Sequence, residues 1–220
     1  MPRAKAVNHH YFDELSERSA WMLGFWMADG SITKRYHSYQ IAFYQKDRGV
    51  LEMIKKELGS EHTICGCTRA YQLQFCSKHM GKTLYDIFRH SDLSEKSCCV
   101  EWPKLPDGVF WDFMRGWVDG DGHIRCEYGQ HRLTICCGSL PFLSAARDEI
   151  EKYTGILCSI KGGGSVNYMS CYGVYAQAIV GLMYHGASLY IERKKEDAEK
   201  LIAWIPRERY CHSRKRVSDE

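Results

Sequence analysis

The sequence lacks several features that would assign it at once to a class of protein. It has no run of 18 apolar residues, and its first ten residues are polar, so neither a membrane-spanning helix nor a secretory signal is predicted. A net charge of +3 over 220 residues is too small to indicate nucleic-acid binding by itself. The eleven cysteines include no C-x-x-C pair, the spacing that zinc sites favour. We therefore expect reduced thiols in a soluble, intracellular protein.

The composition is that of a folded chain, because 45% of the residues are hydrophobic, enough for a sizeable core. The two halves carry similar charge, +2 for residues 1–108 and +1 for residues 109–220, so any basic surface must be local. The segment Arg207–Arg216 holds five basic residues and one acid. We expect a solvated terminus there, with electrostatic steering of a DNA backbone as the alternative.

One stretch of sequence occurs twice. Trp21–Gly30 reappears in altered form as Phe113–Gly122, and each copy closes with an Asp-Gly pair that contains Asp29 or Asp121. A single copy is more typical of a buried helix that ends at glycine. Duplication instead indicates a paired site, since two carboxylates brought together by touching helices repel each other unless a divalent cation lies between them.

The spacing of small residues in both copies predicts how the two helices pack. In each copy two small residues stand four positions apart and therefore lie on one helical face. Helices that meet through such faces bring their backbones unusually close. The residues predicted at this interface are Gly24, Ala28, Gly116 and Gly120.

The repeat extends beyond the motif. The offset of 92 residues between the two aspartates also aligns Val50-Leu51 with Phe142-Leu143. Farther on, Cys76–His90 best matches Cys171–His185 at an offset of 95, which predicts a three-residue insertion around residues 162–164. An internal repeat of this size indicates duplication and pseudo-twofold symmetry.

Periodicity predicts the same order of elements in both repeats: helix, two strands, helix, two strands, helix. After the first motif helix we expect strands Ser31–Lys34 and Tyr39–Gln45, a helix from Asp47 to Gly59, strands His62–Cys67 and Tyr71–Cys76, and a helix Lys78–Arg89. The second repeat predicts strands Gly122–Glu127 and Arg132–Cys137, a helix Leu140–Tyr153, strands Leu157–Lys161 and Val166–Cys171, a helix Tyr175–Tyr184, and a final helix Glu192–Trp204.

These elements divide the chain into four segments. We predict a first repeat with an N-terminal extension over residues 1–90 and a second repeat over residues 109–206. Residues 91–108 contain Pro103, Pro106 and Gly108 with few periodic apolar residues, and are predicted to be the linker. Residues 207–220 form the basic tail.

Met22–Gly30 and Met114–Gly122 closely resemble the LAGLIDADG motif of homing endonucleases. The second copy is the better match, because Met27 in the first copy stands where the family usually has its earlier acid. The resemblance implies a single-chain α+β protein of two pseudo-symmetric αββαββα repeats. Its antiparallel sheets would form a saddle for double-stranded DNA, its motif helices would pack at the centre, and the protein would be a monomer.

The resemblance further implies site-specific, metal-dependent double-strand cleavage of a long, non-palindromic DNA target, leaving short 3′ overhangs. Mg²⁺ or Mn²⁺ would be the cofactor, and Ca²⁺ would support binding without cleavage. The ligands would be the carboxylates of Asp29 and Asp121, with the backbone carbonyls of Ala28 and Gly120 as further donors at the helix ends. Asp119 takes a structural role near the end of its helix by the same resemblance.

Further residues near each metal follow from the resemblance. Lys96 and Lys194 match a basic position that orients water and offsets phosphate charge, although without the resemblance both are more typical of surface lysines. Gln45 matches a polar residue that contacts solvent beside the metals, whereas its counterpart at an offset of 92 is Cys137. The two predicted metal sites are therefore not equivalent.

The predicted strands carry one polar face in each repeat. Their Gln, Arg, Tyr and Asn side chains are of types that read base edges in the major groove, whereas a solvated sheet face would favour Lys, Glu and Thr. An ordinary solvated face is the alternative for these strands taken alone. In the first repeat the candidate DNA-binding residues are Ser31, Thr33, Arg35, Gln40, Tyr44, Gln72 and Gln74. In the second repeat they are His123, Arg125, Glu127, Arg132, Thr134 and Asn167.

Two alternatives remain from the sequence. An RNA-splicing maturase on the same scaffold would bind intron RNA without needing to cut, but both motif acids are present, which favours the nuclease. A non-catalytic DNA-binding regulator is the second alternative, and no helix-turn-helix segment is predicted to support it. The chain ends lack the nucleophile and terminal asparagine of a self-splicing intein, so we expect an intron-encoded or free-standing enzyme.

Overall fold

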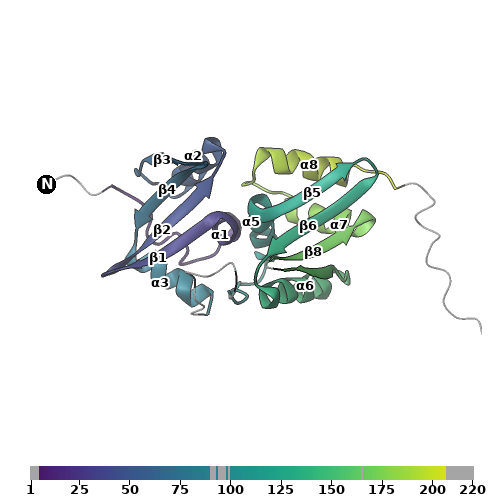
Figure 1. Cartoon of the computed structure of the whole chain (residues 1–220), viewed down its shortest axis with the longest axis horizontal. Coiled ribbons are helices and arrows are strands. Elements are labelled where there is room, and N and C mark those ends of the chain that lie inside the picture. The colour runs from purple at the N-terminus through teal and green to yellow at the C-terminus, as the bar shows by residue number, and fades with distance from the viewer. Residues whose placement is uncertain (1–4, 90–92, 94–97, 99, 165, 207–220) are drawn as a thin grey trace, which may run out of the picture.

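The computed structural model describes residues 5–89, 93, 98, 100–164 and 166–206. These residues form two halves with the same order of elements, side by side (Figure 1). The first half consists of α1 (Glu17–Asp29), β1 (Gly30–Arg35), β2 (Ser38–Gln45), α2 (Arg48–Glu57), β3 (Ile64–Cys67), β4 (Ala70–Cys76) and α3 (Lys78–Ile87). The second half consists of α5 (Phe110–Asp121), β5 (Gly122–Glu127), β6 (Gln130–Cys137), α6 (Leu140–Thr154), β7 (Ser159–Gly163), β8 (Val166–Tyr172) and α7 (Gly173–Tyr184). A final helix, α8 (Glu192–Ile202), follows.

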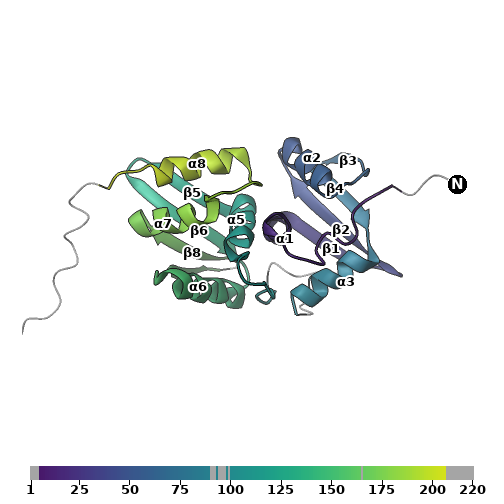
Figure 2. The same cartoon turned by 180° about the vertical axis from the view of Figure 1, so that it is seen from behind.

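Each half contains one antiparallel four-stranded sheet. The strand orders are β1-β2-β4-β3 and β5-β6-β8-β7, so the topology is the same in both halves. Apolar side chains at alternate positions bury one face of each sheet, and helices cover that face. Seen from behind, α3 and α7 lie across the backs of the two sheets (Figure 2). The predicted α+β architecture of two αββαββα repeats is confirmed.

The helices α1 and α5 pack against each other at the centre of the molecule (Figure 1). Their contact is backbone on backbone, because a Cβ added to Gly24 would lie 2.0 Å from the carbonyl oxygen of Phe113. A Cβ added to Gly116 would lie 1.9 Å from the carbonyl oxygen of Trp21. The two contacts are equivalent, because Gly24 and Gly116 are counterparts at an offset of 92 residues, and so are Trp21 and Phe113. Pseudo-twofold symmetry therefore extends to the atoms of this interface.

The position of the insertion differs from the sequence prediction. Phe43 of β2 pairs with Leu73, whereas its counterpart Ile135 pairs with Met169, so β4 and β8 correspond at an offset of 96. The offset has already reached 96 at β7, because Ile64 of β3 pairs with Leu73 and its counterpart Ile160 of β7 pairs with Met169. The extra residues therefore lie before β7. The extra residues lengthen the C-terminal end of α6, which has 15 residues where α2 has 10. The predicted three-residue insertion around residues 162–164 is wrong.

Local signals explain where several helices begin. Ser16 caps α1 in a capping box with Ser19, and the Asp47 side chain accepts a hydrogen bond from the backbone of Gly49 at the start of α2. Ser77 and Ser139 cap α3 and α6 in the same way. In the part of the chain that the structure describes, none of the helices is both long and apolar enough to span a bilayer.

Candidate active site

The two motif aspartates are the last residues of the two central helices. Asp29 ends α1 and is half-buried, while Asp121 ends α5 and is exposed. The helix ends touch, since a Cβ added to Gly120 would lie 2.3 Å from the Cβ of Ala28. That same position lies 3.6 Å from Oδ2 of Asp29, so the Asp29 carboxylate faces the end of α5. The fold thus brings a carboxylate from each half to one end of the helix pair.

Gln45 holds the Asp29 carboxylate. Its Nε2 donates a hydrogen bond to Oδ2 of Asp29 over 3.0 Å, and its Oε1 accepts one from the backbone of Lys46 over 2.8 Å. Together these contacts fix which end of the amide faces Asp29. Gln45 is the last residue of β2, and β2 pairs with β1, the strand that follows Asp29 directly.

The second half presents sulfur where the first presents an amide. Cys137, the counterpart of Gln45, is buried, and the neighbouring Cys136 donates through Sγ to the backbone carbonyl of Asp121 over 3.2 Å. Burial raises the pKa of the Cys136 thiol, and the charge of Asp121 raises it further. A neutral thiol therefore stands beside Asp121 at neutral pH, so the surroundings of the two carboxylates differ.

Lys194 lies beside the second carboxylate. It stands in the first turn of α8 with a side chain only 4% exposed, and its Nζ donates to the carbonyl of Gly122, the residue after Asp121. Burial lowers its pKa, while the charges of Asp119 and Asp121 oppose that shift. The structure thus places a cation at the second carboxylate. The predicted partner for the first half, Lys96, lies outside the described residues.

Asp119 faces the interior and not the paired carboxylates. It is fully buried and accepts hydrogen bonds from Trp21 Nε1 over 2.8 Å, from the Tyr184 hydroxyl over 2.5 Å and from the backbone of Ile191 over 3.1 Å. Burial raises its pKa to about 6. Because Trp21 belongs to α1, this carboxylate ties the two halves together and also anchors the segment that leads into α8.

A buried arginine, Arg115, holds the segments that pack behind the site, and this role was not predicted from the sequence. Arg115 is 1% exposed, and its Nη1 bonds Asp112 over 2.8 Å and the Met183 carbonyl over 2.7 Å. Its Nε donates to the carbonyl of Leu189 over 3.0 Å, which fixes the chain just before α8 and Lys194. Arg115 is the one basic residue of α5, and its charge between Met114 and Gly116 of the motif is the signal that the sequence offers for this role.

The polar residues predicted in the first half lie on one face of the sheet. The strand register puts them on the face opposite the core, in line with the alternation of buried Ile41 and Phe43. Hydrogen bonds join them in a row: Arg35 to Gln40, Gln40 to Gln74 over 2.8 Å, Gln72 to Gln74 over 2.9 Å, Gln72 to Tyr44 over 2.8 Å and Ser31 to Tyr44 over 3.5 Å. Thr33 pairs with Gln40 on the same face.

In the second half, five of the six predicted residues share the equivalent face. Register pairs His123 with Thr134, Arg125 with Arg132, and Glu127 with Gln130. Asn167 does not share this face, because it pairs with buried Cys137 and donates from Nδ2 to the carbonyl of Gly138 over 2.9 Å. The predicted position of Asn167 on this face is wrong, since the true offset differs by one residue and a slip of one residue in a strand reverses its faces.

Residues that the sequence prediction missed occupy that face instead. Tyr168 takes the position assigned to Asn167, and Lys161 pairs with it on β7. Both line a depression of about 440 Å³ that opens beside the second carboxylate, together with Asp121, His123, Arg132, Thr134, Cys136 and Ser170. The candidate DNA-binding surface in this half is therefore continuous with the predicted metal ligand.

The donors at the helix ends suit a hard divalent cation. Two carboxylates, and the backbone carbonyls of Ala28 and Gly120 in the last turns of the two helices, are the oxygen ligands that Mg²⁺ and Mn²⁺ prefer. The Asp29 carboxylate aimed at the opposite helix is the geometric observation that supports this fit.

Comparison with known proteins bears on the fold. Residues 16–79 match the family model described as a LAGLIDADG-like domain. No curated protein sequence matches the chain. Solved structures do match over most of its length at low sequence identity, which carries information on the fold alone.

Three of these structures illustrate the similarity. I-SmaMI bound to an uncleaved DNA target in the presence of calcium ions is 11% identical, with a TM-score of 0.58 over 85% of this chain and 90% of that one. The homing endonuclease I-WcaI bound to its DNA recognition sequence is 14% identical, with a TM-score of 0.57 over 86% and 90%. Mesophilic variants of the homing endonuclease I-DmoI are 14% identical, with a TM-score of 0.56 over 82% and 92%. The family model thus confirms the resemblance for the first copy of the motif, and the solved structures confirm the expected fold over most of the chain.

Proposed function

Because the chain has the LAGLIDADG fold in its single-chain, two-repeat form, we propose that it is a site-specific DNA endonuclease that makes metal-dependent double-strand breaks in a long, non-palindromic target. The observation that carries the proposal is the pair of motif carboxylates at the touching ends of α1 and α5. On this proposal a single copy of the chain is the active unit, since both carboxylates come from one chain.

The two sheets supply binding in this proposal. Their polar faces offer amide, guanidinium, imidazole and hydroxyl groups, which pair with base edges and phosphates. Duplex DNA would lie along both faces so that its scissile phosphates reach the carboxylates. The row of glutamines and Tyr44 in the first half is pre-ordered by its own hydrogen bonds, which lowers the entropic cost of binding.

Asp29, Asp121 and the carbonyls of Ala28 and Gly120 would hold Mg²⁺ or Mn²⁺, which activates water and neutralises charge on the leaving oxygen when bound. Gln45 keeps the Asp29 carboxylate in place and offers its amide to water or phosphate on that side. Lys194 supplies positive charge beside Asp121 and offsets the phosphate on that strand. We extend the same role to Lys96 in the first half.

The cleavage experiment described below also tests the alternative of an RNA-splicing maturase, because a maturase need not cut DNA. Both motif carboxylates are present at the ends of their helices, which favours the nuclease. The polar faces of the sheets suit duplex DNA as well as structured RNA.

The experiment that tests the proposal is cleavage of a randomised duplex library by the purified protein with Mg²⁺, followed by sequencing of the cut ends. We expect ends that gather at one long, non-palindromic sequence, with short 3′ overhangs and no cutting in EDTA. Ca²⁺ in place of Mg²⁺ should allow binding without cleavage. Ends scattered without sequence preference, or cleavage that persists in EDTA, would contradict the proposal.

A further inference from the structure

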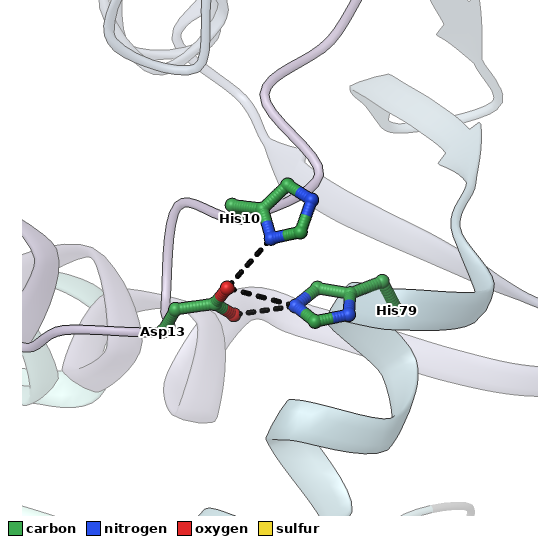
Figure 3. Close-up of side chains that lie close together, drawn as sticks. All are labelled: His10, Asp13 and His79. Carbon is green, nitrogen blue, oxygen red and sulfur yellow. Dashed lines mark hydrogen bonds and ion pairs between the residues drawn. The ribbon is translucent and has the colours of Figure 1, made fainter.

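A second group of metal-ligand side chains lies in the first half, away from the paired carboxylates. Among the described residues, His10, Asp13 and His79 each offer one ligand atom, and these three atoms lie within 4.8 Å of one another. His10 Nδ1 lies 2.6 Å from Asp13 Oδ2, and His79 Nε2 lies 2.6 Å from Asp13 Oδ1 (Figure 3). We propose that this cluster is a binding site for a transition-metal ion of the zinc class, which fastens the N-terminal extension to α3.

The cluster lies on the side of the sheet away from the candidate DNA surface. His79 belongs to the first turn of α3, and α3 packs on β2 so closely that a Cβ on Gly81 would lie 2.3 Å from the Tyr39 ring. Tyr39 shares its face with buried Ile41, whereas Gln40 lies on the opposite, polar face. The cluster is thus separate from the surface proposed to bind DNA.

The donor set favours zinc-class ions over magnesium. Two imidazole nitrogens and one carboxylate oxygen are typical zinc ligands, while Mg²⁺ prefers oxygen alone. Tetrahedral ligands at zinc distances of about 2.0–2.1 Å stand about 3.4 Å apart. The His10 and His79 side chains are 69% and 47% exposed, so their rings are free to turn by the small amount required. Three protein ligands leave the fourth position to water.

The backbone around the cluster is already fixed. On the N-terminal side, Phe12 is buried, the backbone of Asn8 donates to the carbonyl of Leu58 over 2.9 Å, and the backbone of His10 donates to the Asn8 side chain over 3.0 Å. On the α3 side, Thr83 Oγ1 donates to Asp13 Oδ1 over 3.3 Å, which helps to hold the carboxylate between the two rings. Little backbone conformational entropy is therefore lost when an ion binds.

A bound ion would link two segments far apart in sequence. His10 and Asp13 belong to the extension, whereas His79 lies in α3, 69 residues beyond His10. Because the ligands are adjacent only in the folded chain, binding stabilises the folded state according to the free ion concentration. At one hundred times the dissociation constant, the melting temperature should rise by roughly 5–10 °C for a chain of this size.

The test is titration of the full chain with Co²⁺, whose visible spectrum reports ligand type and geometry, in excess Mg²⁺ to occupy the carboxylate site. We expect one saturating equivalent with nitrogen and oxygen ligands, displaced by Zn²⁺, and a metal-dependent rise in melting temperature. His10→Ala and His79→Ala should each weaken binding by more than about tenfold. His37→Ala, which removes an exposed histidine from the β1–β2 turn, should leave binding unchanged.

His79→Gln serves as a second variant, because it keeps a polar side chain at the start of α3 and guards against loss of folding. Melting without metal should show that each variant is folded. The proposal is overturned if Co²⁺ fails to saturate at one equivalent or if the histidine variants bind as wild type does. It is equally overturned by a sulfur-to-cobalt charge-transfer band, which would assign the ion to exposed Cys65 and Cys67 instead.

Discussion

Asp29 and Asp121 stand at equivalent positions but have different neighbours. Asp29 accepts a hydrogen bond from the Gln45 amide, whereas Asp121 lies beside a thiol, Cys136, and a buried cation, Lys194. An amide both donates hydrogen bonds to water and accepts them, whereas a neutral thiol does so weakly, so the two groups do not assist water equally. The proposed endonuclease is therefore expected to cut its two strands at different rates.

Substitution of Gln45 tests this difference. Gln45→Ala removes the donor to Asp29 and should slow cleavage of one strand more than the other, so that plasmid nicked in a single defined strand accumulates. The measurement is strand-specific product formation on end-labelled target, with Cys137→Ala as the matched variant in the second half. An equal effect of Gln45→Ala on both strands would contradict the assignment.

Asp119 is expected to make stability depend on pH. Its folded-state pKa of about 6 lies above the value of about 3.9 for an unfolded aspartate, with Tyr184 and Arg115 as its titratable and charged neighbours. Its contribution to stability is therefore fully present below about pH 4 and is lost as the pH rises through about 6.

Asp119→Asn provides the comparison. An asparagine keeps one oxygen for Trp21 and Ile191 and turns its NH₂ toward the Tyr184 hydroxyl, so it should be tolerated. Between about pH 4 and 7, the unfolding free energy of wild type should fall relative to the variant by roughly 3 kcal/mol. Urea unfolding at several pH values measures this difference in unfolding free energy. If the unfolding free energies of the two proteins change in parallel with pH, Asp119 does not titrate in this range.

At the scale of elements, the α1–α5 contact depends on glycine. A methyl group on Gly116 would lie 1.9 Å from a backbone oxygen, which no side-chain rotation relieves. Gly116→Ala should therefore destabilise the protein by about 3 kcal/mol or more. Gly181→Ala is the matched control, because Gly181 also lies within a helix but has nothing within 4 Å of the added Cβ. That change should be neutral or stabilising by about 0.5–1 kcal/mol.

Urea or thermal unfolding of both variants checks this prediction. Equal stability of the Gly116→Ala and Gly181→Ala proteins would mean that the central helices do not meet as closely as described.

Much of the element order follows from the sequence, because apolar alternation in β2 and the serine and aspartate helix caps are local signals. The length of α6 does not follow from them. Its extra residues continue an amphipathic helix, so no local pattern marks them as an insertion, and the register of β8 was consequently misplaced by one residue. Tyr168 and Asn167 exchanged faces for that reason.

Local sequence patterns also do not predict the hydrogen-bond partners of Arg115 and Lys194. Both side chains are buried against backbone carbonyls of segments distant in sequence, Leu189 for one and Gly122 for the other. The packing of α8 against β5 brings Lys194 to Gly122, whereas the packing of α5 against α7 brings Arg115 to the end of α7. The motif thus predicted which two carboxylates stand at the touching helix ends, whereas the residues around them required the structure.

At the scale of the whole molecule, the two sheet faces differ in their side chains. Thr33 and Arg35 in the first half correspond to Arg125 and Glu127 in the second. Side chains that differ between halves read different half-sites, so the preferred target should be non-palindromic. Arg35→Ala should relax base preference in one half-site by about 1–3 kcal/mol at the position it reads and leave the other half-site unchanged. Selection from a randomised library by each protein checks this, and a symmetric change would contradict it.

The most direct test of the account is cleavage of the selected target by the Asp29→Asn and Asp121→Asn proteins in Mg²⁺. Each substitution removes one carboxylate from the touching helix ends, so neither protein should make double-strand breaks. Both should still bind the target in Ca²⁺, because the proposal assigns DNA binding to the sheets and not to these carboxylates. Asp107→Asn, an exposed aspartate outside the helices, is the control and should cut as wild type does. Linear product at the wild-type rate from either motif variant would contradict the account.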